Sequence, residues 1–134
     1  MARPNPTAVA DSTAEPAYAG VSGMEKGLAI ATHLLGLLTA FLGPLVLYLV
    51  FRRSASPWLR EHLDESLNYW ILVTAAAVVL TVLAIVLGSS GAVIFVALLA
   101  VLVVAVAVLF GVVSIVKAAL GKPSHYPLNI RLIK

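Results

Sequence analysis

Cysteine is absent from the chain, and charged residues are scarce. Without a cysteine the protein can form no disulfide and offers no thiolate ligand to a metal. Only 11% of its 134 residues are charged, whereas about 25% is usual in soluble domains. Hydrophobic residues make up 61%, against roughly 45–50% in a soluble domain. The composition therefore predicts an integral membrane protein with a single domain.

The basic excess of the chain is small and does not indicate a nucleic-acid partner. The formal net charge is +3, but the basic residues flank apolar runs and form no patch. Such flanking positions are typical of residues that set membrane orientation. We therefore predict the lipid bilayer as the partner of the chain, and no nucleic acid.

Three long apolar runs predict an all-α, polytopic membrane protein with three transmembrane helices, at about residues 28–51, 69–87 and 92–116. At about 1.5 Å per residue, each run is long enough for a hydrocarbon core of about 30 Å. Pro44 after Gly43 predicts a kink in the first run. The alternative is that the first run is a re-entrant hairpin around these two residues.

The two ends of the chain are predicted to lie outside these spans. Residues 1–22 show no apolar period and are predicted to be disordered. Ser22 and Glu25 have the spacing of a capping box, so the first helix should begin near Gly23. Residues 23–134 then form one transmembrane domain, and residues 121–134 are its C-terminal tail.

A polar interval between the first two runs predicts a short amphipathic helix at residues 57–68. Ser56 suits the N-cap and Pro57 the first helical position. Apolar residues then recur at helical spacing, and the opposite face is polar. We expect this helix to lie in the membrane surface with its polar face in solvent. The polar face consists of Arg60, Glu61, Asp64, Glu65 and Asn68.

The placement of lysine and arginine predicts the orientation of the chain. Seven of these nine residues lie in the loop after the first run or at the C-terminal end. With three spans, both regions fall on the same side, which the positive-inside rule makes cytoplasmic. The prediction is a multi-pass protein of the plasma membrane with its N-terminus outside and its C-terminus inside.

Small residues recur at steps of three and four in each apolar run. In membranes such small-residue seams let helices approach closely. They predict a compact antiparallel three-helix bundle, and they could also mediate self-association. The seams are Ala29, Thr32, Gly36, Thr39 and Gly43 in the first run; Thr74, Ala77, Thr81, Ala84 and Gly88 in the second; and Ala97, Ala100, Ala107, Gly111, Ser114 and Ala118 in the third.

Few side chains are candidates for chemistry. His33 is the only ionisable side chain within a predicted span, which makes it a functional candidate; the alternative is a neutral histidine hydrogen-bonded to a backbone carbonyl or a threonine. A proton relay would need a second buried acid or base, and the later two spans contain none. His62 with Glu61 or Glu65 matches no zinc signature and is expected to be solvated. We therefore predict no enzyme activity, no metal and no cofactor.

Three segments together have the signature of a known membrane-protein family. They are ATHLLGLLTAFLGPLVLYLV, WLREHLDESLNYWI and HYPLNIRLIK. They resemble the prokaryotic domain of unknown function numbered forty-eight seventy, which is distantly similar to the twenty-kilodalton Tic subunit of the chloroplast translocon. The resemblance covers roughly residues 23–134 and assigns no chemistry. It singles out His33, Pro44, Glu61, His62, Glu65, Asn68, Tyr126 and Pro127.

These features predict a non-enzymatic assembly or accessory component that associates with itself or with other membrane proteins. The alternative is an oligomeric conduit or translocon-like channel component, in which His33 and threonine side chains would form a polar lining. A membrane-embedded enzyme using His62 is the third hypothesis.

Overall fold

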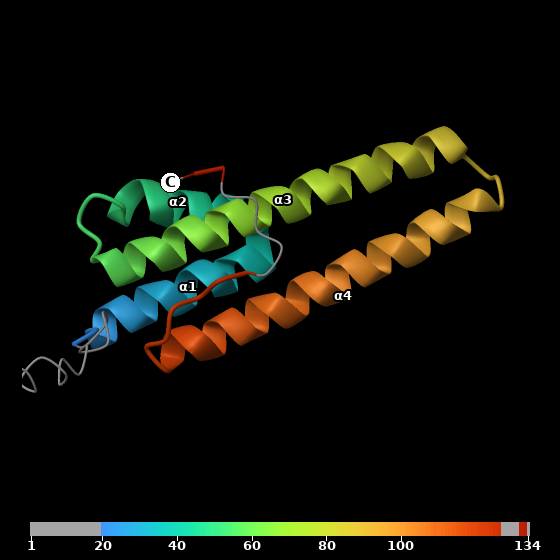
Figure 1. Cartoon of the computed structure of the whole chain (residues 1–134). Helices are drawn as coiled ribbons and strands as arrows, with labels where there is room; N and C mark the ends of the chain where they lie inside the picture. Colours follow the sequence, from blue (N-terminus) through green and yellow to red (C-terminus); the bar gives the residue numbers. More distant parts are fainter. Residues whose placement is uncertain (1–19, 127–131, 134) are drawn as a thin grey trace, which may run out of the picture.

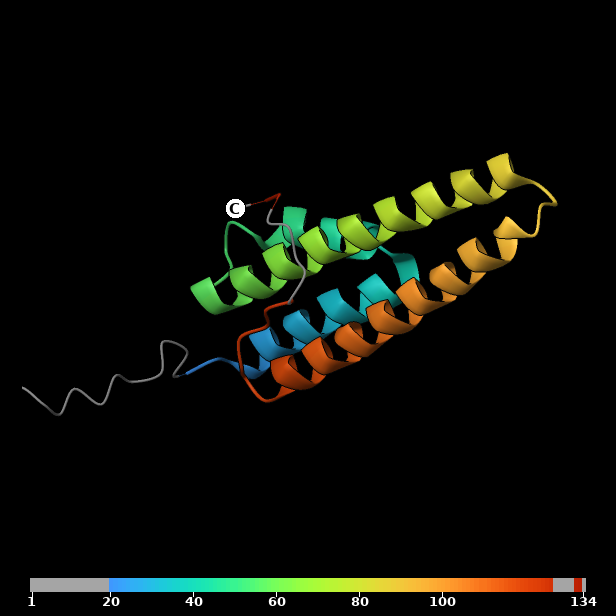
Figure 2. The same ribbon diagram turned by 45° about the vertical axis from the view of Figure 1, so that its right-hand side comes forward.

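Four helices form the part of the chain that this computed structural model describes, residues 20–126 and 132–133. They are α1 (Gly23–Thr39), α2 (Leu42–Phe51), α3 (Pro57–Leu87) and α4 (Ala92–Ala119). The helices α3 and α4 form a long antiparallel hairpin, and α1 and α2 pack against one end of it (Figure 1). The other end of the hairpin projects well beyond α1 and α2 (Figure 2). The prediction of an all-α protein is confirmed.

The first predicted span, residues 28–51, is two helices instead of one. In a continuous helix Pro44 could not donate to the carbonyl of Ala40, and its ring would clash there. The chain breaks at Ala40, which has φ 54°, and Pro44 falls in the first turn of α2. The Thr39 hydroxyl accepts a hydrogen bond of 2.9 Å from the Gly43 N–H. The chain reverses at this break, as the hairpin alternative predicted (Figure 1).

The predicted surface helix and second span are one continuous helix, α3. Its start is as predicted, because Ser56 accepts a hydrogen bond from the Leu59 N–H and Pro57 takes the first position. The predicted boundary between residues 68 and 69 is wrong, because residues 58–87 contain no glycine or proline to break the helix. The first turns of α3 are packed inside the protein, so a surface helix is also wrong.

Two of the described helices, α3 and α4, are long and apolar enough to cross a membrane. The helix α2 is apolar but has only 10 residues. At about 1.5 Å per residue, α3 and α4 exceed the hydrocarbon thickness of about 30 Å, whereas α2 reaches only half of it. The prediction of three spans is not confirmed, because the first run is divided.

The start of α1, the loop of residues 52–56 and the end of α4 lie at the same end of the molecule (Figures 1 and 2). A Cβ atom placed on Gly121, just after α4, would lie 3.2 Å from Cε of Lys26 in α1. This arrangement does not support the predicted orientation, which put the start of the first run and the end of the last on opposite sides. The α1–α2 hairpin is the reason, because it returns the chain to its starting side.

The packed core lies where α1 and α2 cover the hairpin. There the predicted small-residue seams of α1 and α4 lie in the helix contacts. Their buried members are Ala29, Thr32, Gly36, Ala107, Gly111, Ser114 and Ala118. In the projecting half the seam of α3 is not covered, and Ala77, Thr81 and Gly88 are exposed. The packed bundle therefore lies at one end of the molecule only, and four helices form it where three were predicted. The buried hydrophobic side chains of this core include Tyr48, Trp58, Leu63, Leu67 and Trp70.

Candidate functional site

Buried polar side chains gather where the C-terminal tail crosses α1 and α3. The hydroxyl of Tyr126 in the tail lies 3.0 Å from Nδ1 of His33 in α1. Nε2 of His33 lies 3.0 Å from Nδ1 of His62 in α3. Nε2 of His62 lies 3.0 Å from the carbonyl oxygen of Lys122, again in the tail. These three contacts form one chain of hydrogen bonds, which we call the Tyr–His–His chain.

The direction of every hydrogen bond in the Tyr–His–His chain follows from its last acceptor. The Lys122 carbonyl can only accept, so Nε2 of His62 carries a hydrogen and donates. In the neutral ring Nδ1 of His62 is then an acceptor, which requires a hydrogen on Nε2 of His33. Nδ1 of His33 in turn accepts from the Tyr126 hydroxyl. A further proton on either ring would replace an acceptor with a donor and break one of the bonds.

Aromatic side chains enclose the Tyr–His–His chain. The Trp58 ring lies 4.3 Å from the His62 ring, and the Tyr69 ring stacks on Tyr126 at 3.9 Å, centroid to centroid. Both histidines are fully buried. Burial also raises the pKa of Tyr126 above its ordinary value of 10.0, so its hydroxyl keeps its proton and remains a donor.

His33 is buried and hydrogen-bonded, as the second interpretation had it, but its partners are Tyr126 and His62, where a backbone carbonyl or a threonine was expected. The two later predicted spans offered no second acid or base, and the partner of His33 comes from outside them, from His62. His62 was assigned to a solvated surface helix, whereas the tail and α1 cover it. All four ring nitrogens of the two histidines are engaged in hydrogen bonds.

The acidic residues beside His62 contact the tail. Glu65 is 4% exposed, and its Oε2 accepts a hydrogen bond of 3.4 Å from the Tyr126 N–H. Oε1 of Glu61 lies 3.1 Å from Nδ1 of His125, at the edge of the cluster. The expectation of a solvated polar face is therefore wrong for Glu65 and His62. It failed because the tail, 61 residues away in sequence, lies on this face.

Asn68 binds the tail through its side-chain amide. Its Nδ2 donates to the carbonyl of Ile133 at 3.0 Å. Its Oδ1 accepts from the N–H groups of Leu132 and Ile133 at 3.1 and 2.8 Å. One side chain thus satisfies three backbone groups of the tail, which gives Asn68 a clear structural role.

Several serine and threonine residues join this region and were not predicted as part of it. The Ser66 hydroxyl donates to the carbonyl of Thr32 at 3.2 Å, which links α3 to α1. The Ser124 hydroxyl donates to that of Ser114 at 2.9 Å, which links the tail to α4. No local sequence pattern could have shown these pairs, because each depends on helix packing. The small-residue seams were the one signal, since they include Thr32 and Ser114.

The remaining predicted residues lie apart from the cluster or beyond the described chain. Pro44 is buried in the first turn of α2 and shapes the α1–α2 hairpin. Pro127 lies outside the described residues, as do residues 1–19 of the predicted disordered segment. Within the described ranges, no group of three or more His, Asp or Glu side chains is placed to hold a metal ion. The absence of a cofactor stays a prediction, as does a functional role for the singled-out residues.

Comparison with known families decides where the chain belongs. The model of the MamF/MmsF family, described as the magnetosome magnetite crystal formation protein family, matches residues 24–133. The chain belongs to this family. No curated protein and no solved structure matches it. The MamF/MmsF match covers nearly the whole of α1, all of α2, α3 and α4, and the tail residues that complete the Tyr–His–His chain.

The family match corrects the resemblance inferred from the three sequence segments. That resemblance pointed to the family numbered forty-eight seventy and to the Tic translocon subunit, and the match to the MamF/MmsF family contradicts it. The conduit alternative loses its support with the translocon analogy. Its proposed lining residue, His33, is also fully buried between helices and tail.

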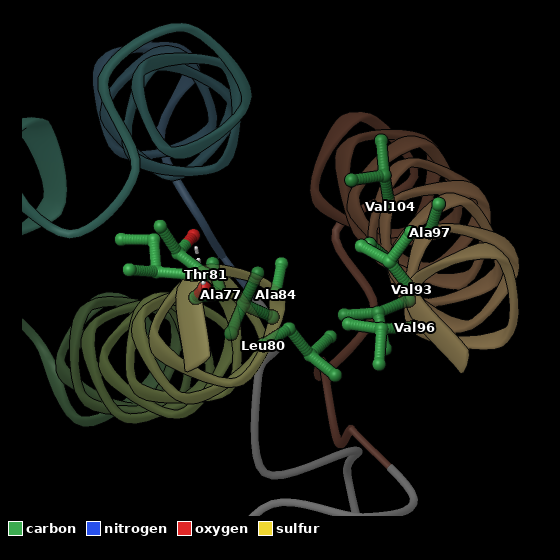
Figure 3. Close-up of a pocket in the computed structure, with 12 residues that line it drawn as sticks. Ala77, Leu80, Thr81, Ala84, Val93, Val96, Ala97 and Val104 are labelled. Atoms are coloured by element: carbon green, nitrogen blue, oxygen red, sulfur yellow. Dashed lines mark hydrogen bonds between the residues drawn. The ribbon is translucent and has the colours of Figure 1, made fainter. Parts of the chain in front are cut away.

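A second feature of this MamF/MmsF member is an apolar groove in the projecting half of the hairpin. It has a volume of about 470 Å³ and lies between α3 and α4. The labelled side chains of the two helices face each other across it (Figure 3). The small lining residues are Ala77, Thr81, Ala84, Ala97 and Ala100.

Proposed function

We propose that this MamF/MmsF protein is a non-enzymatic accessory component of a membrane in which magnetite crystals form. The observation that carries the proposal is the family match over residues 24–133. An accessory role agrees with a small protein whose long apolar helices suit a bilayer. Several of its buried polar side chains bind its own tail.

The proposal includes a multi-pass orientation with both ends of the described chain in the cytoplasm. The start of α1, the α2–α3 loop and the end of α4 share one side, and the described basic residues lie there. The positive-inside rule then makes this side cytoplasmic. The chain has no cysteine, so S54C and S89C provide clean single sites for labelling. A membrane-impermeant maleimide should label only S89C from outside, and labelling of S54C from outside would refute this orientation.

The non-enzymatic part of the proposal rests on the burial of the Tyr–His–His chain, whose hydrogen bonds are all made within the protein. A catalytic group must reach its substrate, whereas these side chains reach only one another and the tail. His33 and His62 are fully buried. Their hydrogen bonds are all satisfied within the protein, which is the pattern of a structural polar network.

The projecting half of the hairpin is where this protein would meet partners, either a second copy or another membrane protein. Most of its exposed residues are apolar, and alanine and valine make up most of the lining of the α3–α4 groove. Helices associate in lipid through such small residues, because close approach increases van der Waals contact.

Magnetite crystal size is the readout that tests the proposed function. The chain should be expressed in a magnetite-forming bacterium from which its own MamF/MmsF protein has been deleted. We expect electron microscopy to show crystals shifted toward the parental size distribution. Unchanged crystals, in cells whose magnetosome membranes contain the chain at normal amounts, would refute it.

His62→Gln separates an accessory role from an enzymatic one. It removes the imidazole but keeps a polar side chain of similar length. In an accessory protein, crystal size should follow the amount of folded protein in the membrane. Loss of crystal formation with the amount of folded protein unchanged would contradict the non-enzymatic assignment.

A further inference from the structure

Three arginines line one open pocket where α2 ends and α3 begins. The pocket has a volume of about 480 Å³, and its lining is Tyr48, Leu49, Arg52, Arg53 and Arg60. Arg52 and Arg53 follow the last residue of α2, and Arg60 closes the first turn of α3. The short loop of residues 52–56 brings these two helix ends together. The three side chains therefore border the same space.

One wall of this pocket is held in place by an aromatic ring. The Arg52 guanidinium lies 5.0 Å from the centroid of the Tyr48 ring, a cation–π contact. Tyr48 is only 7% exposed, so the ring is fixed by the core behind it. The arginine that rests on it is oriented before any ligand arrives. Ordering a ligand-binding side chain in advance reduces the entropy lost on binding.

The charges around the pocket favour an anion. The Asp64 carboxylate, which is not part of the pocket lining, interacts with the charges of Arg52 and Arg60. The carbonyl end of the α2 dipole adds a partial negative charge, which the arginines offset. The lining of the pocket contributes three guanidinium groups and no carboxylate, which favours an anion.

An apolar strip leads away from the pocket along α2. It consists of Leu42, Val46 and Leu49, which lie four and three residues apart and so share one helix face. All three side chains are more than half exposed, and Leu49 also lines the pocket. A ligand that fits both parts would have an anionic head and a long apolar tail.

We propose that this pocket binds the phosphate of an anionic phospholipid, with an acyl chain lying along the α2 strip. Guanidinium groups bind phosphate oxygens through paired, charge-assisted hydrogen bonds, which a lysine cannot reproduce. A soluble phosphate ester offers the same head but leaves the strip uncovered. The basic side of the protein, where the pocket lies, is the side on which anionic headgroups are attracted.

Native mass spectrometry of the full chain in detergent tests this site. The chain is titrated with phosphatidylglycerol, and phosphatidylcholine serves as the zwitterionic comparison. The variant R53Q/R60Q removes two guanidinium groups and keeps Arg52 on its aromatic ring. Its matched control, K26Q/K117Q, removes the same charge from the same end of the molecule. Each basic residue near an anionic surface contributes roughly a fivefold factor in affinity, so R53Q/R60Q should bind phosphatidylglycerol about thirtyfold more weakly.

Each result of the lipid titration either supports the site or overturns it. Loss of phosphatidylglycerol binding in R53Q/R60Q, with K26Q/K117Q within twofold of the parent, supports the site. Equal weakening in both variants would show general charge attraction and overturn it. Displacement of the lipid by millimolar inorganic phosphate would show that a soluble phosphate suffices, which overturns the lipid assignment. If R53Q/R60Q unfolds in detergent, R53Q alone carries the test, with a loss of roughly fivefold expected and no loss overturning the proposal.

Discussion

A single methyl group should have opposite effects at two glycines of α1. Gly36 lies against Trp70, and a Cβ atom placed there would overlap the indole ring. Gly27 lies on the same helix, and a Cβ atom there would meet nothing within 4 Å. We therefore predict that Gly27→Ala stabilises the protein and that Gly36→Ala destabilises it relative to Gly27→Ala.

The size of the difference follows from two effects. Alanine in place of glycine inside a helix is favourable by about 0.8–1.0 kcal/mol, and this gain applies at both positions. Overpacking at Gly36 should cost about 1–3 kcal/mol, because Trp70 is only 5% exposed and has no open space to enter. The helix contribution cancels between the two variants. Their difference in unfolding free energy should therefore be about 1–3 kcal/mol, all of it steric.

Thermal unfolding of both variants in the same detergent, followed by circular dichroism, measures this difference. At about 4 °C per kcal/mol for a chain of this size, the two Tm values should differ by about 4–12 °C. The pair Gly36→Ala and Trp70→Leu should also couple, since the smaller leucine leaves room for the added methyl group. Equal Tm values, or purely additive effects of this pair, would refute the packing of α1 on α3.

Three smaller predictions concern contacts at the ends of the helices. Asn68→Leu removes three hydrogen bonds to the tail, so the two tail amides that it binds should lose hydrogen-exchange protection, and continued protection would contradict the assignment. Thr39→Val removes the hydroxyl that accepts from the start of α2 and should lower the unfolding free energy by about 1 kcal/mol; Thr81→Val, on an exposed face, should change it little in the same melt. Hydrogen bonding, chiefly by the Ser56 hydroxyl, lowers the pKa of Glu25 from its ordinary value of 4.5. The stabilisation that ionised Glu25 gives the folded protein is therefore fully present above pH 4.5 and is lost as the pH falls through the folded-state pKa. The difference in Tm between the parent and Glu25→Gln should disappear in acid and persist at pH 6.

Local signals in the sequence were sufficient to predict where α1 and α3 begin. The capping box of Ser22 and Glu25 is present as predicted, with hydrogen bonds of 3.1 and 3.2 Å in the two directions. Ser56 and Pro57 begin α3 at the predicted residue. These predictions succeed because a cap depends on residues three positions apart and on little else.

The break in the first run was only partly predictable. Pro44 was taken as a kink, but its missing N–H acts four residues earlier, at Ala40, where the chain reverses. Hydropathy cannot show this reversal, since both halves of the run are apolar. The hairpin was therefore no more than an alternative until the packing of α1 on α2 was known.

The polar cluster was the least predictable part of the protein. His33 and His62 are 29 residues apart, and Tyr126 is 93 residues from His33. Their contact requires both the α1–α2 hairpin and the returning tail. With α3 divided into a surface helix and a span, His62 was assigned to solvent, and the second base was missed. Long-range contacts of this kind leave no periodic pattern in the sequence.

The uncharged half of the hairpin limits what the protein can recognise. Residues 66–116 contain no Asp, Glu, Lys or Arg, and they include the whole turn at residues 88–91. An oxide surface or a metal ion on that side of a membrane would meet two serine hydroxyls and a short stretch of backbone. Carboxylates that could gather iron are missing from this face, as are cations that could adhere to a mineral. In the proposed orientation, any influence on a solid beyond this face would use these uncharged groups or a partner protein held by the hairpin.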